Sequence, residues 1–234
     1  LCSWVSQTHS DSFDSNFYNY HGIVGLINTP TARFYNEGVH GVTIYDGTPD
    51  QKITLTSNPY DWFEASFFYT NIQGLPYPGY TYQDYKDKGF NAKIRLKKEG
   101  KLPAIALGLY DFAGTGLYSS EYIVSSYGIN NLDMHFGLGW GRLDGSYDNF
   151  KNPLSYINDR FLTRPTGTGG GGTFVPKKYF AGPTVSPFYG FSFAVNKKLF
   201  LKFEKDPIFV ESTFPYPDRE SDFSYGLDFI INDN

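Results

Sequence analysis

The chain has 234 residues, with 24 acidic and 20 basic side chains and a formal net charge of -4 at pH 7. This acidic balance argues against nucleic acid as a partner, and a lone cysteine excludes an internal disulfide or a cysteine metal cluster. The 22 Phe and 20 Tyr accompany a composition that is polar on average. That combination is typical of a transmembrane β-barrel, which has an apolar outer face, aromatic rims and a polar lumen. No run approaches the ~20 apolar residues of a membrane-spanning helix.

Residues 1–21 form a polar segment that we predict to be irregular. The segment lacks the charged start and the apolar core of a signal peptide. Cys2 is a lipidation candidate, because the first three residues resemble the remnant of lipoprotein processing. An ordinary unpaired cysteine explains the same residues equally well. We expect residues 22–234 to form a single β-barrel domain.

Runs of alternating apolar and polar residues predict β-strands along this domain. Even positions from Leu132 to Trp140 are large and apolar, whereas the odd positions between them are polar or glycine. Turn signals such as Asp46-Gly47 separate the runs. The predicted strands are 32–45, 51–57, 61–72, 88–98, 103–112, 119–127, 131–143, 187–195, 199–205 and 222–232. Since 155–185 leaves room for one or two more, we expect an antiparallel transmembrane barrel of roughly 10–12 strands.

Two long connections are predicted, over 71–88 and 144–186. Long loops at one end of the strands and short turns at the other are typical of outer-membrane barrels. The glycine-rich run 166–172 lacks the Lys-Ser/Thr of a phosphate-binding loop and predicts a flexible surface loop. Tyrosines of the first loop are candidates for stacking on sugar rings, although such residues also gather at membrane interfaces regardless of cargo. These candidates are Tyr77, Tyr80, Tyr82 and Tyr85.

Charged side chains occupy the polar face of several predicted strands, and in a barrel this face lines the lumen. A lipid-facing Lys or Arg near the membrane midplane would cost ~2–4 kcal/mol. We therefore expect these charges inside, where they either brace the wall as ion pairs or bind a substrate. The lumen-lining candidates are Glu64, Lys93, Arg95, Asp111, Glu121, Asp133, His135, Lys202, Glu204 and Asp228.

Asp133 and His135 lie two positions apart and so share a face of their strand, near Ser125 and Ser126 on a neighbouring one. Hydrolytic chemistry needs a nucleophile within hydrogen-bond reach of an oriented base. No motif marks either serine as activated, and the other histidines lack metal-ligand spacing. We predict no catalytic residues, no metal and no cofactor.

A resemblance to a known family rests on several blocks that occur in the family's order. They are GIVGLINTPTAR at 22–33, YKDKGF at 85–90 with Lys93 and Leu96, LPAIALGLYDFAGTGLY at 102–118 followed by Glu121-Tyr122, and GLGWG at 137–141. Through these blocks the chain resembles the YjbH (GfcD, WbfB) family of Gram-negative outer-membrane proteins, which are linked to exopolysaccharide production.

The resemblance implies an outer-membrane β-barrel, often lipid-modified, that corresponds to the first of two barrel-forming regions in longer members. It implies a non-catalytic role in the assembly or export of an extracellular polysaccharide. The implied partners are outer-membrane lipid, the polysaccharide and periplasmic secretion components. Two alternatives stay open: a general porin or structural outer-membrane barrel, and a soluble β-sandwich binding module whose apolar faces pack against each other.

Overall fold

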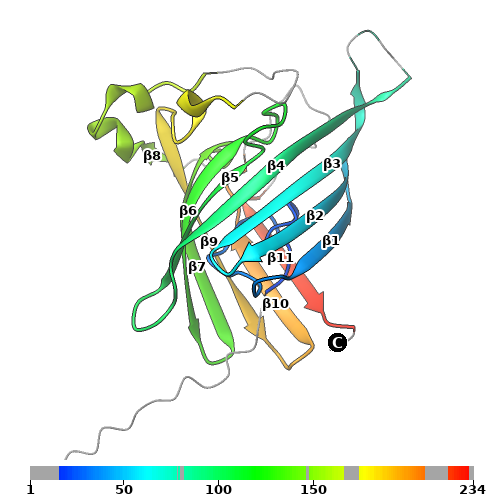
Figure 1. The fold of residues 1–234 in the computed structure, drawn as a ribbon, viewed down its shortest axis with the longest axis vertical. Helices are drawn as coiled ribbons and strands as arrows, with labels where there is room; N and C mark the ends of the chain where they lie inside the picture. Colours follow the sequence, from blue (N-terminus) through cyan, green and yellow to red (C-terminus); the bar gives the residue numbers. More distant parts are fainter. Residues whose placement is uncertain are drawn as a thin grey trace, which may run out of the picture.

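The described strands form one antiparallel sheet (Figure 1). The computed structural model describes residues 16–77, 79, 82–145, 148–165, 174–208 and 221–231. Outside the strands its regular structure consists of short 3-10 turns, and no helix in this part of the chain has the length and apolarity to span a membrane. The predicted all-β, antiparallel class is confirmed.

The sheet has eleven strands, and neighbours in the sequence are mostly neighbours in space. β1 and β11 are its two edges, so the sheet is not closed, and β8 pairs only with the start of β9. One curved sheet does not provide the two facing sheets of a β-sandwich. The strands are β1 (His40–Asp46), β2 (Asp50–Tyr60), β3 (Phe63–Pro76), β4 (Asp84–Lys97), β5 (Ala104–Tyr110), β6 (Ser120–Ile129), β7 (Leu132–Gly141), β8 (Phe150–Lys151), β9 (Thr184–Ala194), β10 (Leu199–Lys205) and β11 (Phe223–Phe229).

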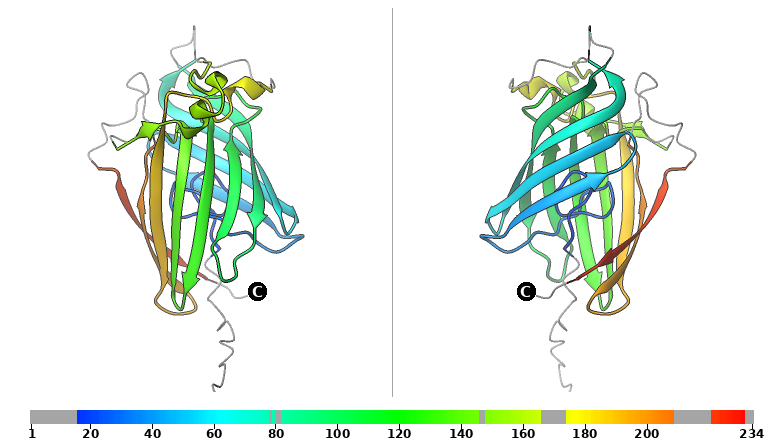
Figure 2. Two further views of the ribbon diagram at one scale, coloured as in Figure 1. Left: turned by 90° about the vertical axis from the view of Figure 1, so that its left-hand side faces the viewer. Right: turned by 90° about the vertical axis from the view of Figure 1, so that its right-hand side faces the viewer.

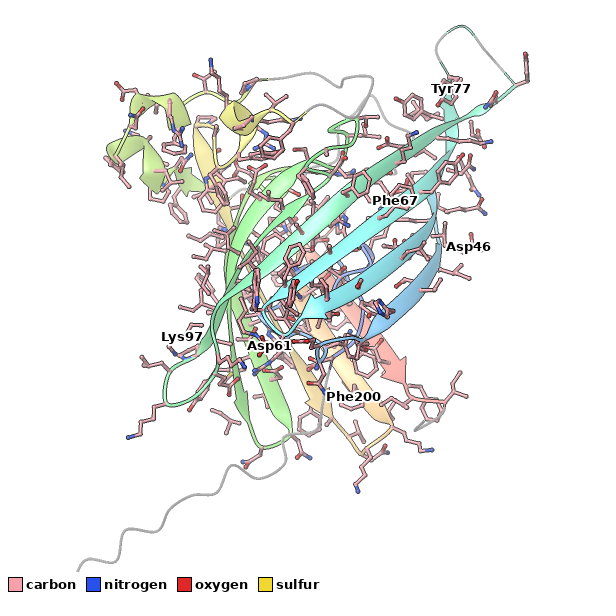
Figure 3. The ribbon with its side chains drawn as sticks, in the orientation of Figure 1. Asp46, Asp61, Phe67, Tyr77, Lys97 and Phe200 are labelled. Carbon is pink, nitrogen blue, oxygen red and sulfur yellow. The ribbon has the colours of Figure 1, made fainter. Side chains whose placement is uncertain are left out.

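The two ends of the sheet differ in their connections. The turns after β2, β4, β6 and β9 are short and lie at one end, called here the turn end, where Figure 3 places Asp61 and Lys97. The connections after β3, β5, β7 and β10 lie at the opposite end, the loop end, near Tyr77. The longest of them carries the 3-10 turns η1 (Pro153–Tyr156), η2 (Asp159–Phe161) and η3 (Pro176–Lys178).

Several predicted boundaries were wrong. β1 begins at His40 rather than at residue 32, because Ala32 and Phe34 pack in the interior against Ala104 and Ala106. Most of the predicted loop 71–88 belongs to β3 and β4, which run on to Pro76 and from Asp84. In the described part of 155–185, 3-10 turns precede the start of β9, with no additional strand.

The sheet has an apolar outer face and a largely polar, buried inner face. Leu201 on β10 lies opposite Phe193 on one side and Leu227 on the other, and the three side chains are 40%, 40% and 70% exposed. The register continues such rows across the sheet, for example from Ile44 through Ile53 to Tyr69. The alternation predicted from the sequence therefore places successive side chains on the exposed outer face and on the buried inner face.

Residues 16–35, called here the inner segment, run inside the curved sheet. Figure 2 shows this segment in dark blue, enclosed by the strands. The segment forms no strand and makes two isolated bridges, Tyr18 with Val24 and Gly25 with Pro30. A side chain at Gly25 would meet the Thr29 carbonyl oxygen at 2.5 Å. This position therefore needs glycine. The resulting tight course of the inner segment places its peptide groups within reach of the strands.

Candidate functional site

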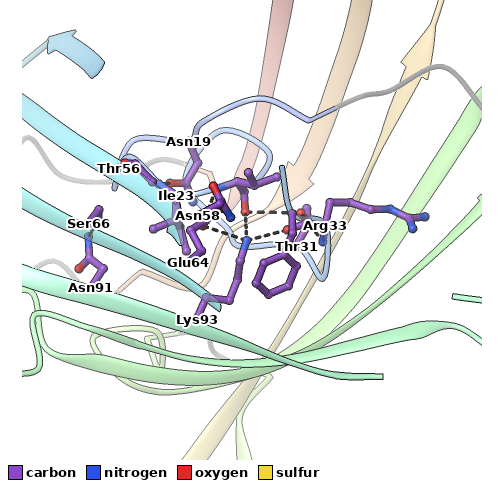
Figure 4. Close-up of polar contacts among 12 residues, drawn as sticks. Asn19, Ile23, Thr31, Arg33, Thr56, Asn58, Glu64, Ser66, Asn91 and Lys93 are labelled. Carbon is purple, nitrogen blue, oxygen red and sulfur yellow. Dashed lines mark hydrogen bonds and ion pairs between the residues drawn. The ribbon is translucent and has the colours of Figure 1, made fainter. Parts of the chain in front are cut away.

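The centre of the interior is an ion pair that binds the backbone of the inner segment (Figure 4). Lys93 on β4 lies 3.1 Å from Glu64 on β3, and both side chains are fully buried. The Lys93 ammonium also donates to the carbonyl oxygens of Val24 at 3.0 Å and Arg33 at 2.7 Å. Glu64 accepts a hydrogen bond from the Val24 N–H at 3.0 Å. Each charge is thereby compensated by its partner and by peptide groups.

Glu204 on β10 binds a second part of the segment. Its carboxylate accepts from three consecutive backbone N–H groups, those of Ile27, Asn28 and Thr29, at 3.1, 2.8 and 3.1 Å. The Thr29 hydroxyl donates to the same carboxylate at 2.7 Å. Hydrogen bonds to an ionised acceptor are roughly twice as strong as neutral ones, so this fully buried carboxylate is a major attachment point for the segment.

Lys202 supplies the complementary contact on the same strand. Its ammonium donates to the carbonyl oxygens of Gly25 at 3.2 Å and Leu26 at 2.8 Å, and lies 2.5 Å from Asp228 on β11. Lys202 and Glu204 therefore bind opposite kinds of peptide group, the first carbonyls and the second N–H groups. The pair with Asp228 also connects this region to the edge strand.

A third set of contacts involves Ser126, Asp133 and His135. Arg33 donates to both oxygens of Asp133, at 2.8 and 2.6 Å. The Ser126 hydroxyl lies 2.8 Å from His135 Nδ1 and accepts from the Ala32 N–H at 2.8 Å. His135 Nε2 is 3.7 Å from Asp133, too far for a hydrogen bond. Ser126 is thus within hydrogen-bond distance of His135, whereas Asp133 pairs with Arg33 of the inner segment.

Two asparagines that the sequence interpretation missed complete the network. Asn19 donates to the Thr29 carbonyl at 3.2 Å and to the Tyr110 hydroxyl at 3.1 Å. Asn91 on β4 donates to the His21 carbonyl at 3.0 Å. The alternating run around Asn91 could have indicated that residue, because an amide on the buried face of a strand must find partners. Asn19 has no comparable signal in the sequence.

Lys52 on β2 is surrounded by aromatic rings. Its ammonium lies 3.7 Å from the ring centre of Tyr20, 4.2 Å from that of Tyr118 and 5.0 Å from that of Phe68. It makes no hydrogen bond within the described residues, so cation–π attraction provides its close contacts. Tyr20 belongs to the inner segment, which Lys52 therefore helps to hold from the loop end.

Asp111 follows β5 at the loop end and turns its side chain inward. A left-handed backbone conformation, with φ of 49°, makes this turn, and the carboxylate accepts from the Tyr118 N–H at 3.0 Å. Burial, together with the nearby Asp87 carboxylate, raises the pKa of Asp111 to about 7. This group changes charge near neutral pH, unlike an ordinary aspartate.

Glu121 lies on the opposite side of β6 from the interior. It is opposite Trp140 in the register, and the long connection after β7 covers it there. Arg164 binds both of its oxygens, at 2.6 and 2.9 Å, and the Phe180 N–H donates to it at 2.8 Å. Glu121 thus attaches a loop to the outside of the sheet, a role that differs from the predicted lining of a lumen.

The remaining candidates lie near the two ends. Arg95 stacks on the Phe34 ring at 4.5 Å and lies 3.9 Å from Asp61 at the turn end. Tyr77 and Tyr85 stack on each other at 4.8 Å at the loop end, and Tyr82 is 84% exposed. Cys2 and Tyr80 lie outside the described residues. Their proposed roles in lipidation and sugar stacking stay predictions.

The arrangement as a whole is a scaffold of charges and amides that fixes an irregular segment inside the sheet. No group of three or more His, Cys, Asp or Glu residues in the described ranges is placed to bind a metal ion. The paired donors and acceptors of this scaffold satisfy peptide groups that would otherwise be buried without partners.

Comparisons with known proteins agree on one family. The model of the family described as exopolysaccharide biosynthesis protein YbjH (YjbH) matches residues 17–234. A relative in Escherichia coli strain K12, described as an uncharacterized lipoprotein YjbH, is 32% identical over 219 residues, covering 91% of this chain and 31% of the relative. The chain thus spans about a third of the length of that relative. No solved structure matches.

Proposed function

Because the chain belongs to the YjbH family of exopolysaccharide biosynthesis proteins, we propose that it is a non-catalytic outer-membrane β-barrel that assists the assembly or export of an extracellular polysaccharide. The observation that carries the proposal is the two-faced sheet, apolar outside and polar within. The proposed partners are outer-membrane lipid, the polysaccharide and periplasmic secretion components.

The outer face favours a lipid environment. Phe67 on β3 and Phe90 on β4 are 36% and 44% exposed and lie opposite each other in a band that crosses the sheet. Contiguous apolar patches larger than roughly 600 Å² are rare on soluble monomers. Lipid would cover such a band and leave the polar face enclosed.

A membrane location requires closure, because unpaired edge N–H and C=O groups are not tolerated in hydrocarbon. We propose that β1 and β11 pair in the membrane. The inner segment already contacts both edges: a side chain at Gly41 on β1 would meet the Tyr18 ring at 2.3 Å, and one at Gly226 on β11 would meet Ile27 at 3.1 Å. The segment thus spans the space between the strands that closure would join.

Aromatic residues at both ends of the sheet support strands that cross the membrane from one interface to the other. Tyr60 and Trp62 stack at 5.5 Å at the turn end, where they are about half exposed, and Tyr77 stacks on Tyr85 at the loop end. Such rings are typical of the two membrane interfaces. By analogy with the relative, whose name describes a lipoprotein, we propose that a lipid on Cys2 anchors the chain to the outer membrane.

The occupied interior disfavours the alternative of a general porin. In an open porin, charges line a water-filled channel, whereas here Lys93, Glu64 and Glu204 are buried and bind the inner segment. We therefore favour a specialised component of polysaccharide assembly or export over a nonselective pore.

The proposal is tested by expressing the chain with an export signal and fractionating the envelope. We expect outer-membrane location, resistance to alkaline extraction, and faster gel migration before heating than after it. Phe193→Lys, which places a charge on the exposed outer face, should lower outer-membrane recovery, whereas Lys197→Gln in a short turn should not. Recovery in the aqueous fraction with ordinary migration would contradict the barrel.

The polysaccharide role needs a separate measurement in the source bacterium. Removal of the gene that encodes this chain should change the amount or the length of a secreted polysaccharide, and the wild-type gene should restore it. Unchanged polysaccharide together with a heat-modifiable barrel would reject the role and retain the membrane location.

A further inference from the structure

A polar cavity of about 410 Å³ opens at the turn end of the sheet. Its volume lies within the ~300–1,000 Å³ range of small-molecule sites. It is bordered by the inner segment at Arg33 and Phe34, by Arg95 on β4, and by the turns that carry Lys98 and Asn130. Strands and inner segment thus meet around a single space.

The cavity has one side on which the charges are already compensated. Arg33 is held by Asp133 in a two-fold hydrogen bond and by Glu99 in an ion pair. Glu99 accepts in turn from the Gly128 N–H at 3.1 Å. These carboxylates and the nearby asparagine amides provide fixed acceptors and donors, which suit the hydroxyl groups of a sugar ring.

The other side presents a cation with unused donors. Within the described residues the Arg95 guanidinium makes no hydrogen bond, and the Asp61 carboxylate with which it pairs is 3.9 Å away. The guanidinium carbon of Arg95 lies 4.5 Å from the centre of the Phe34 ring. This contact positions the guanidinium N–H donors for an anion. Lys98 lies beside it, at the cavity rim, and pairs with the same Asp61. A planar guanidinium recognises a carboxylate with two parallel hydrogen bonds.

From this geometry we infer that the turn-end cavity is a binding site for an acidic saccharide unit, whose carboxylate binds Arg95 and whose hydroxyl groups contact the Glu99 and Asn130 side. The inference rests on the proposed function and deepens it by naming the substrate class. In an outer-membrane barrel the short turns face the periplasm, so the site would meet a polysaccharide before it reaches the cell surface. Arg33 and Phe34 join this cavity to the inner segment.

The test measures binding by titration calorimetry to the whole chain in detergent, in a preparation that already shows heat-modifiable migration. The probes are trigalacturonic acid, the neutral maltotriose and inorganic phosphate. We expect trigalacturonic acid to bind more tightly than both. Arg95→Gln should weaken the binding of trigalacturonic acid about tenfold. Lys101→Gln, which changes a cation in the turn after β4 and outside the cavity, should leave that affinity within about twofold.

Equal binding of maltotriose would overturn the acidic class, and binding of phosphate alone would reduce the cavity to a simple anion site. Absence of any binding by the heat-modifiable protein would overturn the inference and leave the barrel intact. If the Arg95→Gln protein has an unchanged melting temperature and an unchanged affinity, Arg95 is not part of the binding site and the inference is wrong.

Discussion

Glu204 on β10 accepts two hydrogen bonds from Thr29 of the inner segment, one from the backbone N–H at 3.1 Å and one from the hydroxyl at 2.7 Å. The two residues are 175 positions apart. The contact joins almost the first and almost the last described elements of the chain, so the inner segment and the C-terminal strands depend on each other.

Glu204→Gln should loosen the inner segment, because one carboxylate oxygen is replaced by an amide that cannot accept. We expect a loss of about 1.5–3 kcal/mol in the free energy of unfolding, measured by urea unfolding in detergent micelles. Amide hydrogen exchange at 27–29 should accelerate. Glu37→Gln, at an exposed position, is the control and should change neither.

Lys93→Met should be among the more damaging single changes, because it leaves Glu64 buried without its cation. Removing one partner of a buried pair costs about 3–5 kcal/mol. The double variant E64Q/K93M should recover a large part of the loss, as measured in the same unfolding experiment. If the two single losses add instead, the pair is not energetically coupled.

Ser126→Ala should lower stability by about 1–3 kcal/mol, because the buried Ala32 N–H and His135 Nδ1 lose their partner. Ser125→Ala is the matched control, since that hydroxyl is exposed and contacts the Phe136 carbonyl. A serine-reactive fluorophosphonate should label neither protein nor the wild type. Labelling that disappears in Ser126→Ala would identify a nucleophile and contradict a purely structural role.

Asp111 predicts a pH dependence of stability. Its folded-state pKa is raised from 3.8 to about 7, chiefly by burial and further by Asp87, while Lys178 opposes the shift. The resulting stabilisation is complete below about pH 4 and is lost as the pH rises through about 7. The free energy of unfolding should therefore fall between pH 4 and 8, and Asp111→Asn should flatten this slope.

The control for that titration is Asp159→Asn, which changes an exposed carboxyl group in η2. It should leave the pH profile as in the wild type. A wild-type profile that does not fall between pH 4 and 8, or an unchanged slope in Asp111→Asn, would show that this carboxyl is ionised freely in the folded protein.

Most of the sheet was predictable, because neighbouring residues of a strand point to opposite faces and so alternate in polarity. Alternation located β7 and β10 within a few residues, and turn residues marked the hairpins between strands. The strand start expected at residue 32 was wrong for a physical reason. Ala32 and Phe34 alternate as strand residues do, but they are buried inside the sheet rather than paired in it.

The candidate site was only partly predictable. Charge on the polar face singled out Lys93, Glu64 and Glu204, all of which are buried. Their partners were not foreseeable, because peptide groups of the inner segment carry no sequence signature as ligands. For Glu121, the sequence showed the charge but not its location. Its position under the loop beside Arg164 depends on a connection that folds back over the sheet.

The sequence by itself determined that this chain is an antiparallel β protein with an apolar and a polar face, since the period of two is a property of neighbouring residues. Only the tertiary structure decided what occupies the polar face. Buried charges need partners, and those partners come from peptide groups as far away as Thr29 is from Glu204. Packing across that separation, rather than local preference, places residues 16–35 inside the sheet.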